Sequence, residues 1–200
     1  MCSSPPTRTS GRCSRFAENG LGYLFPVFGL SYTVQELKVG EGAALNAVIL
    51  SQFLSLLTLP LFSALSDRIG RRPVYLGAAL WSAAWAFPFF ALCETREPIL
   101  ISLAFVGATS IGVAGMFGPQ AAYYCELFGP RVRFGGFAFA REIGSVFAAA
   151  PAPFIAALLL TYGDHRPWLV ACYIVALSLV TALAVIVGPE TSTSDIDADE

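Results

Sequence analysis

The chain has 200 residues, of which 56% are hydrophobic and 13% are charged, and its formal net charge at pH 7 is -2. A soluble domain carries charge on about a quarter of its residues, so this composition argues against a water-soluble globule, which would have to expose much of its apolar surface. The nearly balanced charge argues against nucleic acid as a partner, whereas a lipid bilayer can solvate apolar outer faces.

Six apolar segments are each long enough to cross ~30 Å of hydrocarbon as a helix of roughly 20 residues. They cover residues 16–37, 44–65, 74–93, 99–124, 137–160 and 168–187. The connections are short, so consecutive helices are expected to be antiparallel neighbours. We therefore predict an all-α integral membrane protein whose six transmembrane helices form one bundle over residues 15–188. Residues 1–14 are predicted to be a disordered cytoplasmic segment, and residues 189–200 an acidic cytoplasmic tail.

The basic residues predict the orientation of this bundle. Eight of them fall in the N-terminal segment and in the second and fourth connections (Arg8, Arg12, Arg15, Arg68, Arg71, Arg72, Arg131, Arg133). The opposite side holds three (Lys38, Arg96, Arg166). Because basic loops stay in the cytoplasm, both termini are predicted to be cytoplasmic, in a multi-pass protein of the bacterial plasma membrane.

Several predicted spans contain helix breakers and runs of small residues. Pro26, Pro60 and Pro88 lie inside spans, and the run GATSIGVAG covers residues 107–115. Membrane helices tolerate proline and glycine where neighbouring helices or water satisfy the freed backbone groups, and small residues allow close helix contact. Each feature alone is compatible with ordinary packing, but together they favour a transporter, whose bent helices rock around a central cavity.

The most specific motif is FSALSDRIGRRPVY, residues 62–75, between the second and third spans. An aspartate at the end of one helix is followed by a turn at Gly70 and a cluster of arginines, and Pro73 stands where the next helix can begin. Carboxylate and guanidinium groups at this position can pair with one another and with helix ends. A simple positive-inside anchor is the alternative interpretation.

This stretch resembles the cytoplasmic loop signature of the major facilitator superfamily, G-x-x-x-D-R-x-G-R-R, with Ser63 at the position of the first glycine. Residues 15–32, RFAENGLGYLFPVFGLSY, resemble the seventh span of its metabolite:proton symporter family. Residues 118–136, GPQAAYYCELFGPRVRFGG, resemble the end of the tenth span and the loop after it, and GPET at 188–191 resembles the close of the twelfth. In this order the chain resembles spans seven to twelve, the C-terminal half of a twelve-span transporter.

The resemblance implies proton-coupled symport, by alternating access, of a small organic metabolite such as an organic acid or a betaine-like solute. It further implies a second six-span half as partner, because the cavity lies between two halves. It also implies a cytoplasmic charge network that gates transport, made of the motif residues and two residues of the fourth connection (Asp67, Arg68, Gly70, Arg71, Arg72, Glu126, Arg133).

Ionisable groups inside spans are costly in hydrocarbon and are therefore candidates for the substrate cavity. Glu18 and Asn19 lie near the start of the first span, where Glu18 can face the cavity or pair with Arg15 at the interface. Arg141 and Glu142 lie about one turn inside the fifth span and point roughly 100° apart, so they are not expected to pair with each other. Arg141 can bind an anionic substrate with its planar fork or extend to the interface.

Uncharged polar and aromatic residues are weaker candidates. The amides Asn46, Gln52 and Gln120 can hydrogen-bond either to substrate or between helices. For the aromatic residues of the spans, packing or a place in the interfacial belts is favoured over a cavity (Tyr23, Tyr32, Trp81, Trp85).

Three other functions remain to be weighed. The chain could be a non-transporting fragment of a truncated transporter gene, because residues 1–13 resemble no part of the family. It could be a half-transporter that needs a partner half or a second copy. An enzyme is not expected, because HExxH and GxSxG are absent, and the cysteines and the single His165 show no metal-ligand spacing and imply no cofactor.

Overall fold

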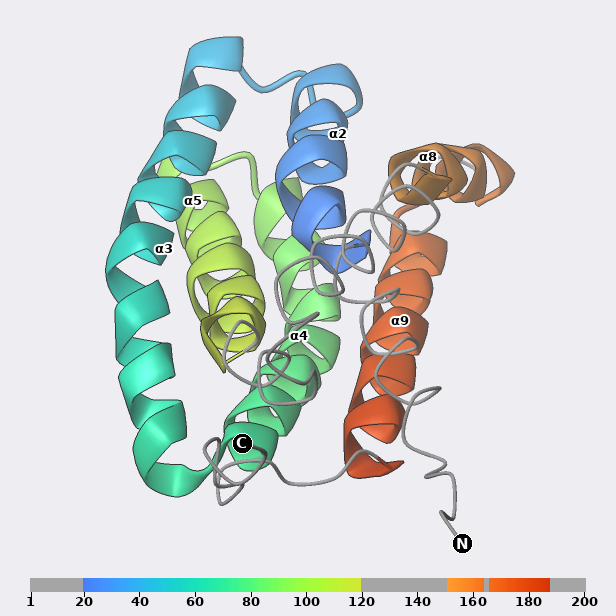
Figure 1. Ribbon diagram of the computed structural model, residues 1–200. Helices are drawn as coiled ribbons and strands as arrows, with labels where there is room; N and C mark the ends of the chain where they lie inside the picture. The colour runs from blue at the N-terminus through green and yellow to red at the C-terminus, as the bar shows by residue number, and fades with distance from the viewer. Residues whose placement is uncertain (1–19, 120–150, 164–165, 188–200) are drawn as a thin grey trace, which may run out of the picture.

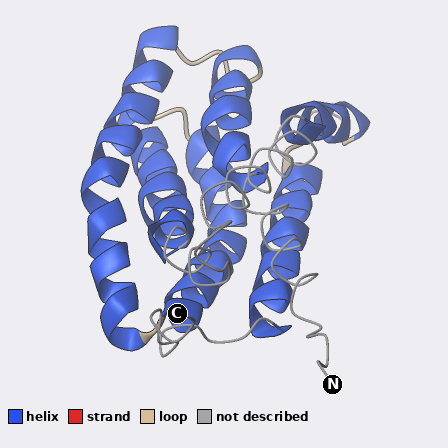
Figure 2. Cartoon of the chain, in the orientation of Figure 1, coloured by secondary structure: helices blue, strands red, loops and turns tan. Residues whose placement is uncertain are grey.

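The computed structural model describes residues 20–119, 151–163 and 166–187, and over these ranges the chain is helical without strands (Figure 2). The elements in chain order are η1 (Leu24–Phe28), α2 (Gly29–Gln35), α3 (Glu41–Ile69), α4 (Arg71–Glu94), α5 (Pro98–Val106), η2 (Gly107–Val113), α8 (Pro151–Tyr162) and α9 (Trp168–Val187). Two of them, η1 and η2, are π-helical turns inside longer helices. The first longer helix covers 20–35 and the second covers Pro98–Pro119. The predicted all-α membrane fold is confirmed.

Within these residues, three helices are long and apolar enough to cross a membrane: α3, α4 and Pro98–Pro119. They match the predicted spans 44–65, 74–93 and 99–124, although α3 extends several residues beyond its span at each end. The other three predicted spans overlap shorter apolar helices, which are 20–35, Pro151–Tyr162 and Trp168–Leu183 of α9. Residues 1–19, 120–150, 164–165 and 188–200 lie outside the described part of the chain, and the predicted terminal segments lie there too.

The long helices run side by side in alternating directions, as the short connections predicted (Figure 1). The helix Pro98–Pro119 packs against both α3 and α4, and α4 packs on its other side against α9. α8 contacts η1 and α9. Positive φ angles at Lys38 and Arg96 turn the chain between consecutive helices at one end of the bundle, and Gly70 does so at the other.

An aromatic cluster joins the first helix to α4 and α5. The Phe89 ring meets Phe25, Phe90 and Phe105 at centroid distances of 5.3, 5.1 and 5.2 Å, all edge to face. Gly29 is required beside it, because a Cβ there would lie 2.8 Å from the Phe89 ring. Since lipid is as apolar as these side chains, such close packing, rather than exclusion of water, holds the helices together.

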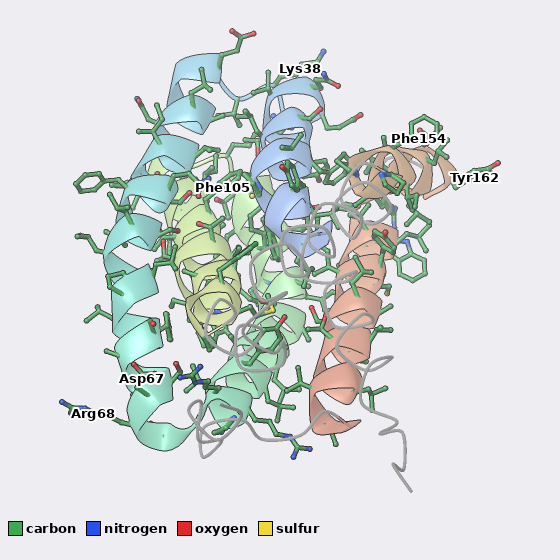
Figure 3. The ribbon with its side chains drawn as sticks, in the orientation of Figure 1. Lys38, Asp67, Arg68, Phe105, Phe154 and Tyr162 are labelled. Carbon is green, nitrogen blue, oxygen red and sulfur yellow. The ribbon has the colours of Figure 1, made fainter. Side chains whose placement is uncertain are left out.

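Apolar side chains also cover the outside of the bundle. On α3 the exposed residues include Ile49, Phe53 and Leu56, which are 61–67% exposed. At the other side of the bundle, Phe154 and Tyr162 project outward from α8 (Figure 3). Outer faces of this kind suit lipid as solvent, as the composition predicted.

Glycines on one face of Pro98–Pro119 let α4 approach closely. A Cβ at Gly107 would lie 2.4 Å from the Trp85 ring, and one at Gly112 would lie 2.5 Å from Ser82 Oγ. The Trp81 and Trp85 indoles stack on each other, and their N–H groups donate to the carbonyl oxygens of Gly107 and Ala104 at 2.9 and 3.1 Å. The small-residue run is therefore a packing surface, and the two tryptophans pack as favoured from the sequence.

Candidate functional site

A pocket of about 220 Å³ lies where three helices meet: the helix 20–35, α3, and the helix Pro98–Pro119. Its lining residues come from all three (Gly22, Tyr23, Pro26, Gln52, Ser55, Leu59, Thr109, Val113, Ala114, Phe117). None of these ten described residues carries a charge. The walls are mostly apolar, and polar groups come from a phenol, an amide and two hydroxyls.

The pocket lies halfway along the two long helices that line it. Gln52 and Ser55 are near the middle of α3, and Thr109 is near the middle of Pro98–Pro119. If these helices cross a bilayer, the pocket lies near its midplane. Secondary transporters bind their substrates at this depth.

The two hydroxyl groups of the pocket donate their protons within the protein. Thr109 Oγ1 donates to the carbonyl oxygen of Phe105 at 2.8 Å, in its own helix. Ser55 Oγ donates to the carbonyl oxygen of Ser51 at 2.8 Å and lies 3.2 Å from Ser110 Oγ, which links α3 to η2. Both hydroxyls therefore strengthen the walls, and their oxygens can only accept from a ligand.

The side chains of Tyr23 and Gln52 differ from these two hydroxyls in their exposure and in their hydrogen bonding. Tyr23 is 53% exposed and Gln52 is also exposed. Neither side chain makes a hydrogen bond to another residue of the described part of the chain. A phenol can donate and accept, and an amide offers two donors and one acceptor. Among the described residues of the pocket, these two side chains therefore carry the hydrogen-bond donors that no other described residue uses.

Both π-helical turns flank the pocket. Pro26 lines it from η1, and Thr109 and Val113 line it from η2. Proline has no backbone N–H, so the hydrogen-bond ladder must rearrange around Pro26, and π-turns are one way in which membrane helices do so. Such turns are frequent at functional sites.

The arginine-rich motif forms a second feature at the end of the bundle opposite Lys38 (Figure 3). Gly70 has φ 109° and ψ 151°, a conformation that L-residues rarely adopt, so glycine makes the tight turn between α3 and α4 possible. Arg71 pairs with Asp67 at 3.5 Å across this turn. Because the Asp67 side chain is 61% exposed, the pair contributes little to stability, about 0–1 kcal/mol.

Arg72 makes a contact with a helix that is distant in the sequence. Its Nη2 donates a hydrogen bond to the carbonyl oxygen of Ile186, in the last turn of α9. A cation at a helix C-terminus satisfies a free carbonyl and interacts favourably with the helix dipole. The motif thus connects the turn after α3 to the end of α9.

The structure separates the weaker sequence candidates. Tyr23 and Gln52 line the pocket, whereas Asn46 is exposed on α3 outside it. Tyr32 is buried and stacks on Phe28, so it packs, as favoured from the sequence. Tyr23, by contrast, is half exposed and lines the pocket, so the role favoured for it from the sequence stays a prediction.

Seven candidates lie outside the described residues: Glu18, Asn19, Arg141 and Glu142 for the cavity, Glu126 and Arg133 for the gate, and the amide Gln120. They stay predictions. Within the described ranges, no group of three or more acidic, histidine or cysteine residues is placed to hold a metal ion.

The sequence reasoning missed Ser55 and Thr109, although a signal for them existed. On α3, the pocket is lined by Gln52, Ser55 and Leu59, whose i, i+3, i+7 spacing places them on one helix face. On the other long helix, the i, i+4, i+8 spacing does the same for Thr109, Val113 and Phe117. Small polar residues in register with Gln52 inside an apolar run could have marked the lining face of α3.

The chain matches the Major Facilitator Superfamily over residues 13–198. It is 33% identical over 161 residues to the shikimate transporter of Escherichia coli (strain K12), covering 80% of this chain and 37% of that transporter. It is 28% identical over 189 residues to the putative transporter YdfJ of the same organism, covering 93% of this chain and 44% of that protein.

A third relative is the citrate-proton symporter of Klebsiella pneumoniae, 27% identical over 144 residues that cover 71% of this chain and 32% of the symporter. The chain thus spans less than half the length of each of these relatives. No solved structure matches it significantly. The match over nearly the whole chain, with the arginine-rich turn and the bundle of membrane-length helices, shows that this chain belongs to the Major Facilitator Superfamily.

Proposed function

We propose that this chain forms one bundle of a transporter that carries a small organic metabolite, an organic acid or a betaine-like solute, by proton-coupled symport. The pocket between Tyr23, Gln52 and Thr109 is the observation that carries the proposal. It combines apolar walls with a few polar groups, as small-molecule sites do, and it lies halfway along membrane-length helices.

The volume of the pocket favours a substrate site that two bundles form together. Its volume of about 220 Å³ is below the roughly 300–1,000 Å³ of typical ligand pockets. We therefore propose that the pocket forms one wall of the substrate site, and that a second six-span bundle, either an N-terminal half or another copy of this chain, supplies the opposite wall. Rocking of the two bundles would open the site to each side in turn.

The kind of solute and the driving ion are supported by the relatives. One similar protein is named a shikimate transporter and another a citrate-proton symporter. For this chain, we propose that Arg141 and Glu142, with Glu18 and Asn19, complete the cavity from outside the described residues.

The contacts of the arginine-rich motif support a gating role. Asp67, Arg71 and Arg72 lie at one end of the bundle and connect α3, α4 and α9. With Arg68, Gly70, Glu126 and Arg133 they would form the cytoplasmic gate, which would place this end and both termini in the cytoplasm. Contacts that form in one transport state and break in the other are a recognised way to switch between conformations.

Uptake into vesicles tests the proposal. The purified chain is reconstituted alone, and in parallel with a six-span N-terminal half from a transporter of the same family, and labelled organic acids and betaines are supplied under an inward proton gradient. We expect uptake that a protonophore abolishes, and an Asp67→Asn variant that loses most of it while remaining helical by circular dichroism.

Each outcome addresses a different part of the proposal. Uptake by the chain alone would indicate assembly of two copies, and uptake only with the added half would indicate a half-transporter. Uptake that the protonophore leaves unchanged would contradict proton coupling. A folded chain that transports no solute in either preparation would contradict the transport function and favour a non-transporting fragment.

A further inference from the structure

We propose that the acidic segment, residues 188–200, binds to the arginine-rich motif at the end of the bundle and is held there by opposite charge. This contact lies within one chain and needs no transport, so it goes beyond the proposed function.

The end of α9 places the start of the acidic segment beside the motif. Arg72 donates a hydrogen bond to the carbonyl oxygen of Ile186, so the last turn of α9 lies against the first turn of α4. The turn between α3 and α4 lies at this same end of the bundle (Figure 1). The acidic segment, which follows α9 in the sequence, therefore begins next to the arginines.

The charges of the two parts are complementary. Residues 67–72 hold three arginines and one aspartate, which gives them a net charge of +2. The acidic segment holds five carboxylate side chains and no basic residue (Glu190, Asp195, Asp197, Asp199, Glu200). Exposed charges attract one another over about a Debye length, which is ~10 Å at 0.1 M salt. Carboxylates tethered beside the arginines fall within this range.

The motif retains hydrogen-bond donors for these carboxylates. A guanidinium group has five N–H donors and can bind a carboxylate with two of them, and the bond to Ile186 engages only one nitrogen of Arg72. Arg68 is exposed and projects outward from the end of α3 (Figure 3). Arg71 pairs with Asp67 at 3.5 Å, and its side chain is only 15% exposed. Arg68 and Arg72 are therefore the partners assigned to the acidic segment.

The length of the acidic segment suits the distance that it must cover. α9 packs on α4, and α4 packs on α3. Because packed helices lie about 8–10 Å apart, the end of α9 is no more than roughly 20 Å from α3. A flexible chain of 13 residues spans roughly 20 Å on average and ~45 Å when extended. A tether that matches the span gives a millimolar effective concentration, an advantage that free anions and lipid headgroups lack.

Distances between two spin labels test the proposal in the full chain. The labels are carried by keto amino acids placed at Leu65, near the end of α3, and at Ala198, so the native cysteines stay unchanged. The chain is placed in nanodiscs of zwitterionic phosphatidylcholine, and double electron–electron resonance is recorded at two salt concentrations. We expect a narrow distance peak at about 0.01 M salt, where the Debye length is ~30 Å, and a broad distribution at about 1 M, where it is ~3 Å.

Charge variants identify the groups that make the contact. The triple variant Asp195→Asn/Asp197→Asn/Asp199→Asn leaves the motif unchanged and should abolish the narrow peak at low salt. Arg68→Gln and Arg72→Gln each remove one of the two assigned partners and should reduce the area of the peak by about twofold.

Arg166→Gln is the matched control. Arg166 is an exposed arginine that precedes α9, at the end of this helix opposite Ile186. This variant should leave the peak unchanged, and circular dichroism should show that all variants fold.

The proposal is overturned if the distribution is broad at both salt concentrations, if the triple variant keeps the narrow peak, or if Arg166→Gln removes it. A recording in nanodiscs that contain phosphatidylglycerol separates the acidic segment from an anionic lipid as the partner of the arginines. A peak that persists there supports the segment, whereas its loss would assign the arginines to lipid headgroups and overturn the proposal. Failure of the proposed function is seen separately, as absence of uptake in the vesicle experiment.

Discussion

The helix Pro98–Pro119 has two faces that its composition does not distinguish, because both consist of small and apolar residues. One face packs on α4, where a Cβ at Gly107 or Gly112 would lie about 2.5 Å from a neighbouring side chain. The other face lines the pocket with Thr109, Val113 and Phe117. The difference shows that a residue's size is strictly limited where a neighbouring helix is already in contact, whereas part of the other face borders open space.

Gly107→Ala tests the packed face and should have the largest effect. The new methyl group would lie 2.4 Å from the Trp85 ring, and this indole cannot move away without losing its hydrogen bond to Ala104. Overpacking of this kind costs about 1–3 kcal/mol, and we expect a loss near the upper end. Unfolding of the purified chain by SDS, followed by circular dichroism, measures it.

Gly77→Ala is the control for this prediction. Gly77 lies in α4, and no atom lies within 4 Å of a Cβ built there. Because alanine is the better helix former, stability should rise by about 0.5–1 kcal/mol. Equal effects at Gly77 and Gly107 would contradict the contrast between packed and open positions.

Gly112→Ala should have a smaller effect that a second substitution relieves. A Cβ at Gly112 would lie 2.5 Å from Ser82 Oγ but 3.6 Å from Ser82 Cβ, so the conflict is with the hydroxyl alone. Moving that hydroxyl away breaks its hydrogen bond to the carbonyl oxygen of Ala78, which costs about 1 kcal/mol. In a double-mutant cycle, Ser82→Ala should restore most of this loss. Additive losses in the double variant would show that the backbones, and not the hydroxyl, are too close.

Features of the fold that depend on a local pattern could be predicted from the sequence. Features that depend on how two helices pack against each other could not. The sixth predicted span, 168–187, agrees with the bounds of α9 because its apolar run ends in polar residues on both sides. The turn at Gly70 was predicted because the motif places a glycine between two helical patterns. Asp67 and Arg71 pair because the turn at Gly70 brings the start of α4 beside the last turn of α3.

Other features could not be inferred from local pattern. Gly107 is limited by Trp85, which is more than twenty residues away and belongs to another helix, so composition shows only that small residues are present. The π-turns leave no periodic signal in runs that are apolar all round. Tyr23 was expected to pack because most span aromatics do, and only the positions of α3 and Pro98–Pro119 show that it borders a pocket.

Tyr23→Phe should have the smallest effect on stability and tests the pocket wall opposite Pro98–Pro119, which the helix 20–35 supplies. The side chain is 53% exposed, and its hydroxyl has no hydrogen-bond partner among the described residues. Removing a hydroxyl in such a position should change the free energy of unfolding by less than about 0.5 kcal/mol, measured by the same SDS titration. A loss above about 1 kcal/mol would mean that the hydroxyl supports the fold. The part of the pocket wall that the helix 20–35 supplies would then be structural, like the face of Pro98–Pro119 that packs on α4.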